Sequence, residues 1–119
     1  MHGNKALLDW YLSKNCEYKK KHGTRLIDYL DIHYYPQMDF STVDESKKAA
    51  RARLDSLKEL YDPSYKSKSW IAEEIALIPR MQKLIAKSCP GTKLAITEYR
   101  FGTAAMGRST FLALSLIHI

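Results

Sequence analysis

Two segments rich in strand-forming residues stand far apart in this chain, and the residues between them carry a helical pattern. The first, residues 26–35 and centred on 30–34, combines branched and aromatic side chains. It is closed by Pro36, which cannot donate to a central strand ladder. The second segment covers residues 93–99 and follows a turn at 89–92. Because strands joined by a long helical crossover pair in parallel, the sequence predicts an α/β fold with two adjacent parallel strands.

Three helices are expected around these strands. Residues 4–22 place apolar side chains at helical spacing and end at Gly23, which can adopt a left-handed cap conformation. Residues 45–60 carry a second apolar stripe. Residues 70–87 carry a third, in which Pro79 lacks a backbone donor and predicts a kink or a fresh helical start. The three expected stripes are Leu8, Tyr11, Leu12 and Cys16; Ala50, Leu54, Leu57 and Tyr61; and Ile71, Ile75, Ile78 and Ile85.

Charge and composition narrow the function only a little. The 119 residues carry a formal net charge of +6 and are 45% hydrophobic, which is ordinary for a folded soluble protein. Part of the charge is the basic run at residues 19–22, which is better explained as a solvated helix end than as a nucleic-acid patch. Cys16 and Cys89 have no metal-ligand spacing, so we expect both in ordinary core packing. We predict no metal, no cofactor and no nucleic-acid partner.

Targeting and membrane signals are absent from the sequence. Met1 is followed by polar residues and an amphipathic stretch, which is not the pattern of a signal peptide. The longest apolar run lies at the C-terminal end and is too short to cross a bilayer. We therefore expect no membrane partner for this chain.

Reactive and hydrogen-bonding side chains collect where both predicted strands end, at residues 31–35 and 97–100. The carboxyl ends of neighbouring parallel strands meet at one edge of a sheet, where functional groups gather. A glutamate there, flanked by aromatic residues, suits glycoside hydrolysis, because the oxocarbenium-like transition state needs a nearby carboxylate. The alternative is structural, with Glu98 paired to Arg100 or Lys93. The spacing by itself favours neither interpretation.

Six stretches of the chain, in the same order, resemble glycoside hydrolase family 44 and together span roughly residues 7–102. The most specific is 90–99, P-G-T-K-L-A-I-T-E-Y, and the next is 31–37, D-I-H-Y-Y-P-Q. The resemblance implies a (β/α)8 TIM barrel with an accessory β-sandwich. This chain would be an internal piece of that barrel, incomplete at both ends. The other four stretches are residues 8–12, 60–65, 69–71 and 77–81.

The resemblance also implies an activity, that of a retaining, endo-acting hydrolase of β-1,4-glucans of the cellulose or xyloglucan type. Glu98 would be its catalytic nucleophile, at the end of the seventh barrel strand. His33 and Tyr35 would line the glucan cleft at the end of the sixth, and Tyr99 would be a further substrate contact. Alternation along a strand places residues 33 and 35 on one face and Tyr34 on the other. A secreted or cell-surface location of the complete protein follows from the same resemblance.

The chain departs from the family pattern in two respects. After the Glu-Tyr pair the family continues with Asn-Trp-Gly, whereas residues 100–102 here are Arg-Phe-Gly. The general acid/base glutamate belongs to the fourth strand, and nothing in this chain matches it. A complete barrel needs ~250 residues. We therefore expect this chain, purified alone, to be inactive.

The C-terminal residues 103–119 show no family resemblance, so residues 1–102 alone are assigned to the barrel. Residues 114–119 resemble the in-frame translation of a sequencing adapter, and we interpret them as an artefact. Trp70 is better explained as a core anchor than as a sugar platform.

Two other functions stay open: a small basic module that binds an anionic partner, and a carbohydrate-binding relative without activity. The glycines are scattered and form no phosphate-binding loop.

Overall fold

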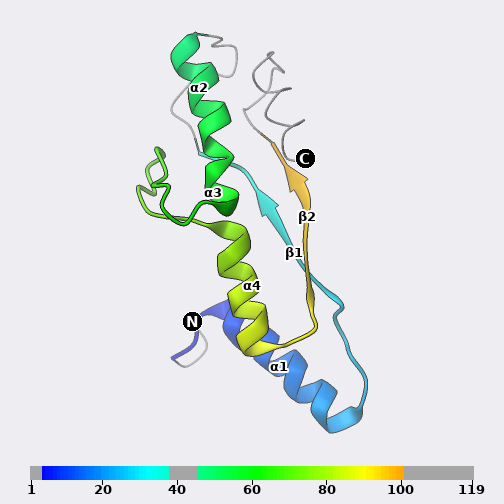
Figure 1. Ribbon diagram of the computed structural model, residues 1–119. Coiled ribbons are helices and arrows are strands. Elements are labelled where there is room, and N and C mark those ends of the chain that lie inside the picture. The colour runs from blue at the N-terminus through cyan, green and yellow to red at the C-terminus, as the bar shows by residue number, and fades with distance from the viewer. Residues whose placement is uncertain (1–3, 38–45, 101–119) are drawn as a thin grey trace. The chain divides into compact units, whose positions relative to one another are not determined.

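The computed structural model describes residues 4–37 and 46–100, so the predicted tail at 103–119 lies outside the described residues. The α/β class is confirmed. By its contacts the chain forms two compact units, residues 1–32 with 80–96 and residues 33–79 with 97–119, whose boundary falls within both strands. The elements in chain order are α1 (Leu7–His22), β1 (Tyr29–Tyr34), α2 (Lys47–Ser56), α3 (Lys58–Tyr61), α4 (Leu77–Ser88) and β2 (Lys93–Tyr99) (Figure 1).

The two strands β1 and β2 are hydrogen-bonded neighbours, as predicted. Where they begin, the Lys93 N–H donates to the Asp28 carbonyl at 2.8 Å. Where they end, the Arg100 N–H donates to the Tyr34 carbonyl at 3.2 Å. Because the bonded residues advance together along both strands, the pair is parallel, and the two arrows in Figure 1 point the same way.

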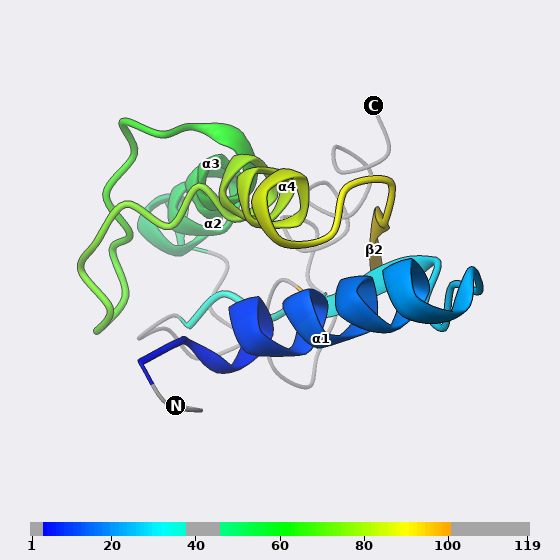
Figure 2. The same cartoon turned by 90° about the horizontal axis from the view of Figure 1, so that it is seen from below.

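In the first unit, α1 confirms the first predicted helix and is unbroken along its length (Figure 2). It ends at Gly23, whose φ of 74° is left-handed and whose N–H donates to the Lys19 carbonyl at 2.8 Å. Of the predicted apolar stripe, Leu12 is completely buried, whereas Leu8 and Tyr11 are exposed. The basic run lies in the last turn, as expected for a solvated helix end.

Asp9 joins α1 to the end of α4 within the same unit. Its Oδ1 accepts a hydrogen bond from Ser88 Oγ at 2.5 Å, and its Oδ2 accepts one from Lys87 Nζ at 3.1 Å. The bond from Ser88, followed by that from Lys87, lowers the pKa of the Asp9 carboxyl below its usual value. The carboxylate therefore acts as a link between two helices that are distant in sequence.

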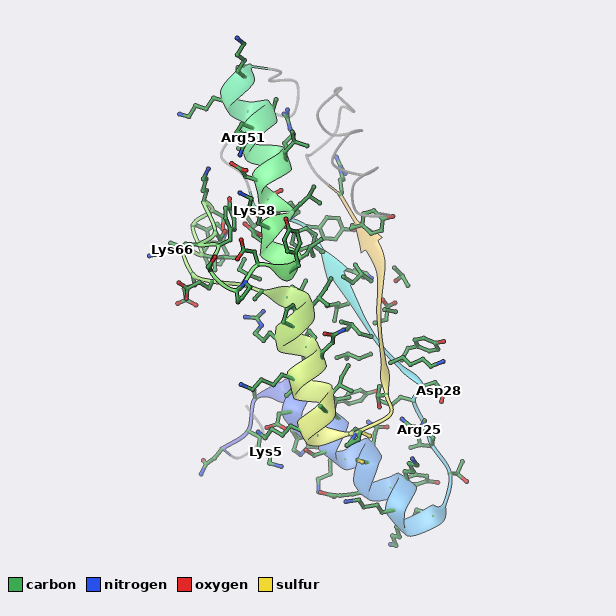
Figure 3. All side chains as sticks on the ribbon, viewed as in Figure 1. Lys5, Arg25, Asp28, Arg51, Lys58 and Lys66 are labelled. Carbon is green, nitrogen blue, oxygen red and sulfur yellow. The ribbon has the colours of Figure 1, made fainter. Side chains whose placement is uncertain are left out.

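Arg25 holds the turn that leads into β2. Its guanidinium donates to Thr92 Oγ1 at 3.1 Å and to the Pro90 carbonyl at 3.3 Å. It also lies 4.0 Å from the Asp28 carboxylate just before β1, and Figure 3 labels both residues. Gly91 has a φ of 87°, and a Cβ there would stand 2.8 Å from the Arg25 Nη2. The turn therefore needs glycine for its backbone and for the close approach of the arginine.

The predicted helix over residues 70–87 is wrong in its first part, because α4 begins only at Leu77. Ala72 and Ala76 have φ angles of 51° and 38°, which a right-handed helix cannot contain. Pro79 is in the first turn of α4, where its missing N–H has no intrahelical partner to lose. The proline thus marks a fresh helical start, one of the two outcomes that its position predicted.

In the second unit, α2 and α3 bury charged side chains beside part of the predicted apolar stripe, of which Leu57 is buried. Tyr61, expected inside, is 59% exposed, whereas Arg53 and Glu59 are 2% and 3% exposed. Trp70, expected as a core anchor, is 78% exposed, so that expectation is also wrong. The buried side chains of the two helices are Ala49, Arg53, Asp55, Ser56, Leu57, Glu59 and Leu60.

Candidate active site

His33 and Glu98 come together where β1 and β2 end. His33 Nδ1 lies 3.4 Å from Glu98 Oε2. In a parallel pair, a residue that donates its N–H stands beside the residue that follows the acceptor. The bond from Arg100 to the Tyr34 carbonyl therefore places residue 100 beside residue 35, and, two positions earlier on both strands, residue 98 beside residue 33. Among the described residues, the titratable side chain in contact with Glu98 is therefore His33, in place of the Arg100 or Lys93 of the structural alternative.

Tyr35, the second residue after His33 and just beyond the end of β1, extends this cluster. Its ring stands edge-on to the His33 ring, with centroids 6.3 Å apart. Tyr35 is 41% exposed, whereas Tyr34 between them is 5% exposed. The structure thus brings together His33, Tyr35 and Glu98 on one face and confirms that Tyr34 points away from them.

Tyr34 anchors the strand end from the opposite side. Its hydroxyl lies 2.7 Å from the Ser56 carbonyl and 3.1 Å from Glu59 Oε2, both of which are acceptors. Burial, followed by the nearby Glu59 carboxylate, raises the pKa of Tyr34 far above its usual value, so the hydroxyl stays a donor. Ser67 Oγ donates to the other Glu59 oxygen at 2.7 Å and stands 2.8 Å from Ser69 Oγ. This buried network fixes the backbone that carries His33.

Sequence reasoning missed the role of Tyr34 and Glu59. The strand pattern correctly placed Tyr34 on the buried face. A buried tyrosine hydroxyl needs a partner, so a search for an acceptor was justified. Nothing in the spacing of the residues singled out Glu59, which lies 25 residues further along the chain.

Tyr99 is the other predicted substrate contact. It follows Glu98 directly in β2, so alternation turns it to the face on which Tyr34 lies. Its side chain is half-buried. A role for Tyr99 in binding substrate stays a prediction.

The remaining described residues offer little for other chemistry. Over residues 4–37 and 46–100, no group of three or more His, Cys, Asp or Glu side chains could hold a metal ion. None of the helices in this part of the chain is both long and apolar enough to cross a membrane. Glu98 presents a half-exposed carboxylate beside an imidazole and an aromatic ring, and a carboxylate is one of the side chains that can act as a nucleophile.

Comparison with known proteins identifies relatives of this chain. A family model described as glycoside hydrolase family 44 matches residues 1–38. Endoglucanase A of Paenibacillus lautus is 35% identical over 109 residues, which cover 80% of this chain and 15% of the relative. The crystal structure of CelM2, a bifunctional glucanase-xylanase from a metagenome library, is 37% identical with a TM-score of 0.79 and covers 85% of this chain and 20% of that one.

A third relative is a Paenibacillus polymyxa xyloglucanase of the same family, solved with xyloglucan. It is 32% identical to this chain, with a TM-score of 0.72, over 85% of this chain and 22% of that one. The chain thus spans less than a quarter of the length of each of these three relatives. The family model matches the first helix and strand, and these relatives cover 80% to 85% of the chain. By both sequence and fold, this chain belongs to glycoside hydrolase family 44.

Proposed function

We propose that this chain supplies the sixth and seventh strands of the catalytic (β/α)8 barrel of a retaining endo-β-1,4-glucanase, with Glu98 as the nucleophile. The observation that carries the proposal is the approach of His33 to Glu98, at 3.4 Å, where two adjacent parallel strands end. Catalytic residues of such barrels come from the carboxyl ends of several different strands. Family membership supports the same assignment.

The burial pattern of β1 also supports a barrel. Leu30 and Tyr34 are each 5% exposed, whereas Tyr29, the first residue of the strand, is 55% exposed. In a (β/α)8 barrel one face of each strand packs against helices and the other faces the barrel interior. Tyr34 faces the α2–α3 segment through Ser56 and Glu59. The open face, which includes His33, would then be the interior face that further strands cover.

The reaction follows from the position of the Glu98 carboxylate. It would attack the anomeric carbon and form a glycosyl ester, while a second carboxyl group protonates the departing glycosidic oxygen. The same second group would then take a proton from water as the water breaks the ester, so configuration is retained. His33 would orient the Glu98 carboxylate, and Tyr35 would offer a ring face to a sugar. The second group belongs to another strand, so this chain alone should not hydrolyse glucan.

The substrate proposed is a β-1,4-linked glucan. The relatives described above are an endoglucanase, a glucanase-xylanase and a xyloglucanase solved with its polysaccharide, which together support this substrate class. A polymer of this kind cannot cross a cell membrane. We therefore propose a secreted or cell-surface location for the complete protein.

The two other functions are less well supported. A basic module for an anionic partner needs free cations on one face, but Arg51, Lys58 and Lys68 lie 3.1, 3.5 and 3.2 Å from the buried Asp55 carboxylate. Figure 3 labels Arg51 on α2 and Lys58 on α3. A carbohydrate-binding relative without activity would share the cleft residues, and only catalysis separates it from the enzyme.

The test is Glu98→Gln in the complete protein, which keeps the shape of the side chain and removes its charge. Reducing-sugar release from carboxymethylcellulose or xyloglucan should collapse, while binding of the glucan persists. Glu17→Gln is the matched control, because Glu17 is exposed and pairs only with Lys14 on α1 among the described residues. Near-normal turnover of Glu98→Gln would contradict the proposal. A wild-type protein that binds glucan without hydrolysing it would favour the inactive relative.

A further inference from the structure

Cys16 and Cys89 have no part in the proposed hydrolase chemistry, and both belong to the first compact unit. Cys16 is in α1, and Cys89 directly follows α4, with its N–H donating to the Ile85 carbonyl at 2.9 Å. Both thiols are free, and the neighbouring Cys89 thiol raises the pKa of Cys16 above its usual value. The sequence predicted ordinary core packing for each of them, but the fold places them together.

Contacts on both sides hold the two cysteines in place: Asp9 and Ser88 are bonded before them, and the Arg25 guanidinium, after α1, donates at 3.3 Å to the carbonyl of Pro90, after Cys89. Leu12, one helical turn before Cys16, is completely buried. Asp9, on the same face of α1, accepts a hydrogen bond at 2.5 Å from Ser88, the residue before Cys89. The helix that carries one thiol is thus tied to the residue next to the other thiol. The approach of the two segments that carry the cysteines is therefore a property of the packed unit.

We propose that Cys16 and Cys89 form an intramolecular disulfide bond under oxidising conditions and so tie α1 to the turn between α4 and β2. The bond would link residues 73 positions apart in the chain (89 − 16). A cross-link over a long loop removes much entropy from the unfolded chain and stabilises the folded one. Such bonds persist outside the cell, the location proposed above for the complete protein. The inference does not depend on the role of Glu98.

The difference in exposure of the two thiols sets the order of the reaction with oxidised glutathione. Cys89 is 2% exposed, whereas Cys16 is half-buried and is the thiol that a reagent can reach. The Cys16 thiolate attacks one glutathione sulfur, breaks the glutathione S–S bond and releases one glutathione thiolate. The Cys89 thiolate then attacks the Cys16 sulfur and releases the second. Two protein thiols are oxidised, one glutathione disulfide is reduced, and the released thiolates take up the protein's two protons.

The experiment is an equilibrium titration of the full 119-residue chain. The chain is equilibrated with mixtures of reduced and oxidised glutathione, quenched with acid and analysed by intact mass and peptide mapping. The same titration in concentrated urea gives the reference for the unfolded chain. The effective concentration of the two thiols should be on the order of tenfold or more higher without urea. An equal or lower value without urea would overturn the proposal.

Two single variants test the order of attack. In Cys89→Ser, the accessible Cys16 should end as a mixed disulfide with glutathione. In Cys16→Ser, the buried Cys89 should stay reduced over the same period. Faster glutathione addition at Cys89 than at Cys16 would overturn this order and the placement of the two thiols.

Discussion

His33 Nδ1 lies 3.4 Å from Glu98 Oε2, and the two side chains are 53% and 57% exposed. A contact this open to solvent, even between opposite charges, contributes about 0 to 1 kcal/mol to stability. The pair therefore does little to hold the fold together. His33 lies against a carboxylate that solvent can reach.

Replacing His33 should consequently separate stability from activity. His33→Gln should change the free energy of unfolding of this chain by no more than about 1 kcal/mol. In the complete protein the same change should lower kcat/KM by on the order of tenfold to a hundredfold, since a misplaced carboxylate attacks poorly. Urea unfolding and initial rates on xyloglucan measure the two effects. A large loss of stability with unchanged kcat/KM would assign His33 to the fold alone.

Tyr34 should show the opposite behaviour. Tyr34→Phe removes the hydroxyl that stands 3.1 Å from Glu59 Oε2 and leaves a buried carboxylate oxygen with one partner fewer. Loss of a buried partner of this kind costs about 1–3 kcal/mol. Urea unfolding of the variant measures the loss, with Tyr61→Phe as the control because Tyr61 is 59% exposed. Equal effects of the two substitutions would show that the buried network adds nothing.

The turn before β2 gives a comparison between two glycines. Gly91→Ala and Gly23→Ala both place a side chain at a positive φ, 87° and 74° respectively. Only the Cβ at residue 91 meets the Arg25 guanidinium, at 2.8 Å, so this substitution should also displace the bonds of Arg25 to Thr92 and Pro90. The extra cost should be about 0.5–1.5 kcal/mol.

The background variant Arg25→Ala is the check on that interpretation. With the guanidinium gone, Gly91→Ala should cost the same as Gly23→Ala. The comparison needs five variants: Gly91→Ala, Gly23→Ala, Arg25→Ala, and each glycine substitution combined with Arg25→Ala. Differential scanning calorimetry or urea unfolding measures their stabilities. A difference that persists in the Arg25→Ala background would mean that another contact, or the backbone itself, distinguishes the two turns.

Asp9 should make the stability of the first unit sensitive to acid. Its pKa is lowered in the folded chain by the bonds from Ser88 and Lys87, relative to the ordinary value of 3.8. The stabilisation is therefore present above pH 3.8 and is lost as the pH falls through the lower, folded pKa. Asp9→Asn should be less stable than the wild type at neutral pH and should lose less on acidification. Parallel acid-side slopes for the two chains, from urea midpoints at a series of pH values, would contradict this role.

The elements that could be predicted from sequence are those whose signals are local. Gly23 ends α1 because glycine alone tolerates the left-handed cap at little cost, and the sequence shows it directly. In β1, the alternation of side chains correctly separated His33 from Tyr34. The meeting of His33 with Glu98 followed from topology, because parallel neighbouring strands end at one edge.

The elements that could not be predicted depend on contacts between distant residues. The left-handed backbone of Ala72 and Ala76 has no sequence signal, since alanine strongly favours the right-handed helix. Arg53 and Glu59 are buried on helices whose apolar spacing indicated a different face. At least for Glu59, partners in the fold explain the burial, because Tyr34 and Ser67 supply its hydrogen bonds.

The assignment of Glu98 is tested most directly by trapping the covalent intermediate. The complete protein is incubated with an activated 2-deoxy-2-fluoro cello-oligosaccharide, which slows both steps and allows the glycosyl-enzyme ester to accumulate. After digestion, mass spectrometry of the peptides locates the sugar. The label should be on Glu98, and Glu98→Gln should take up none while Glu17→Gln is labelled normally. A label on any other carboxylate, with Glu98 unmodified, would contradict Glu98 as the nucleophile.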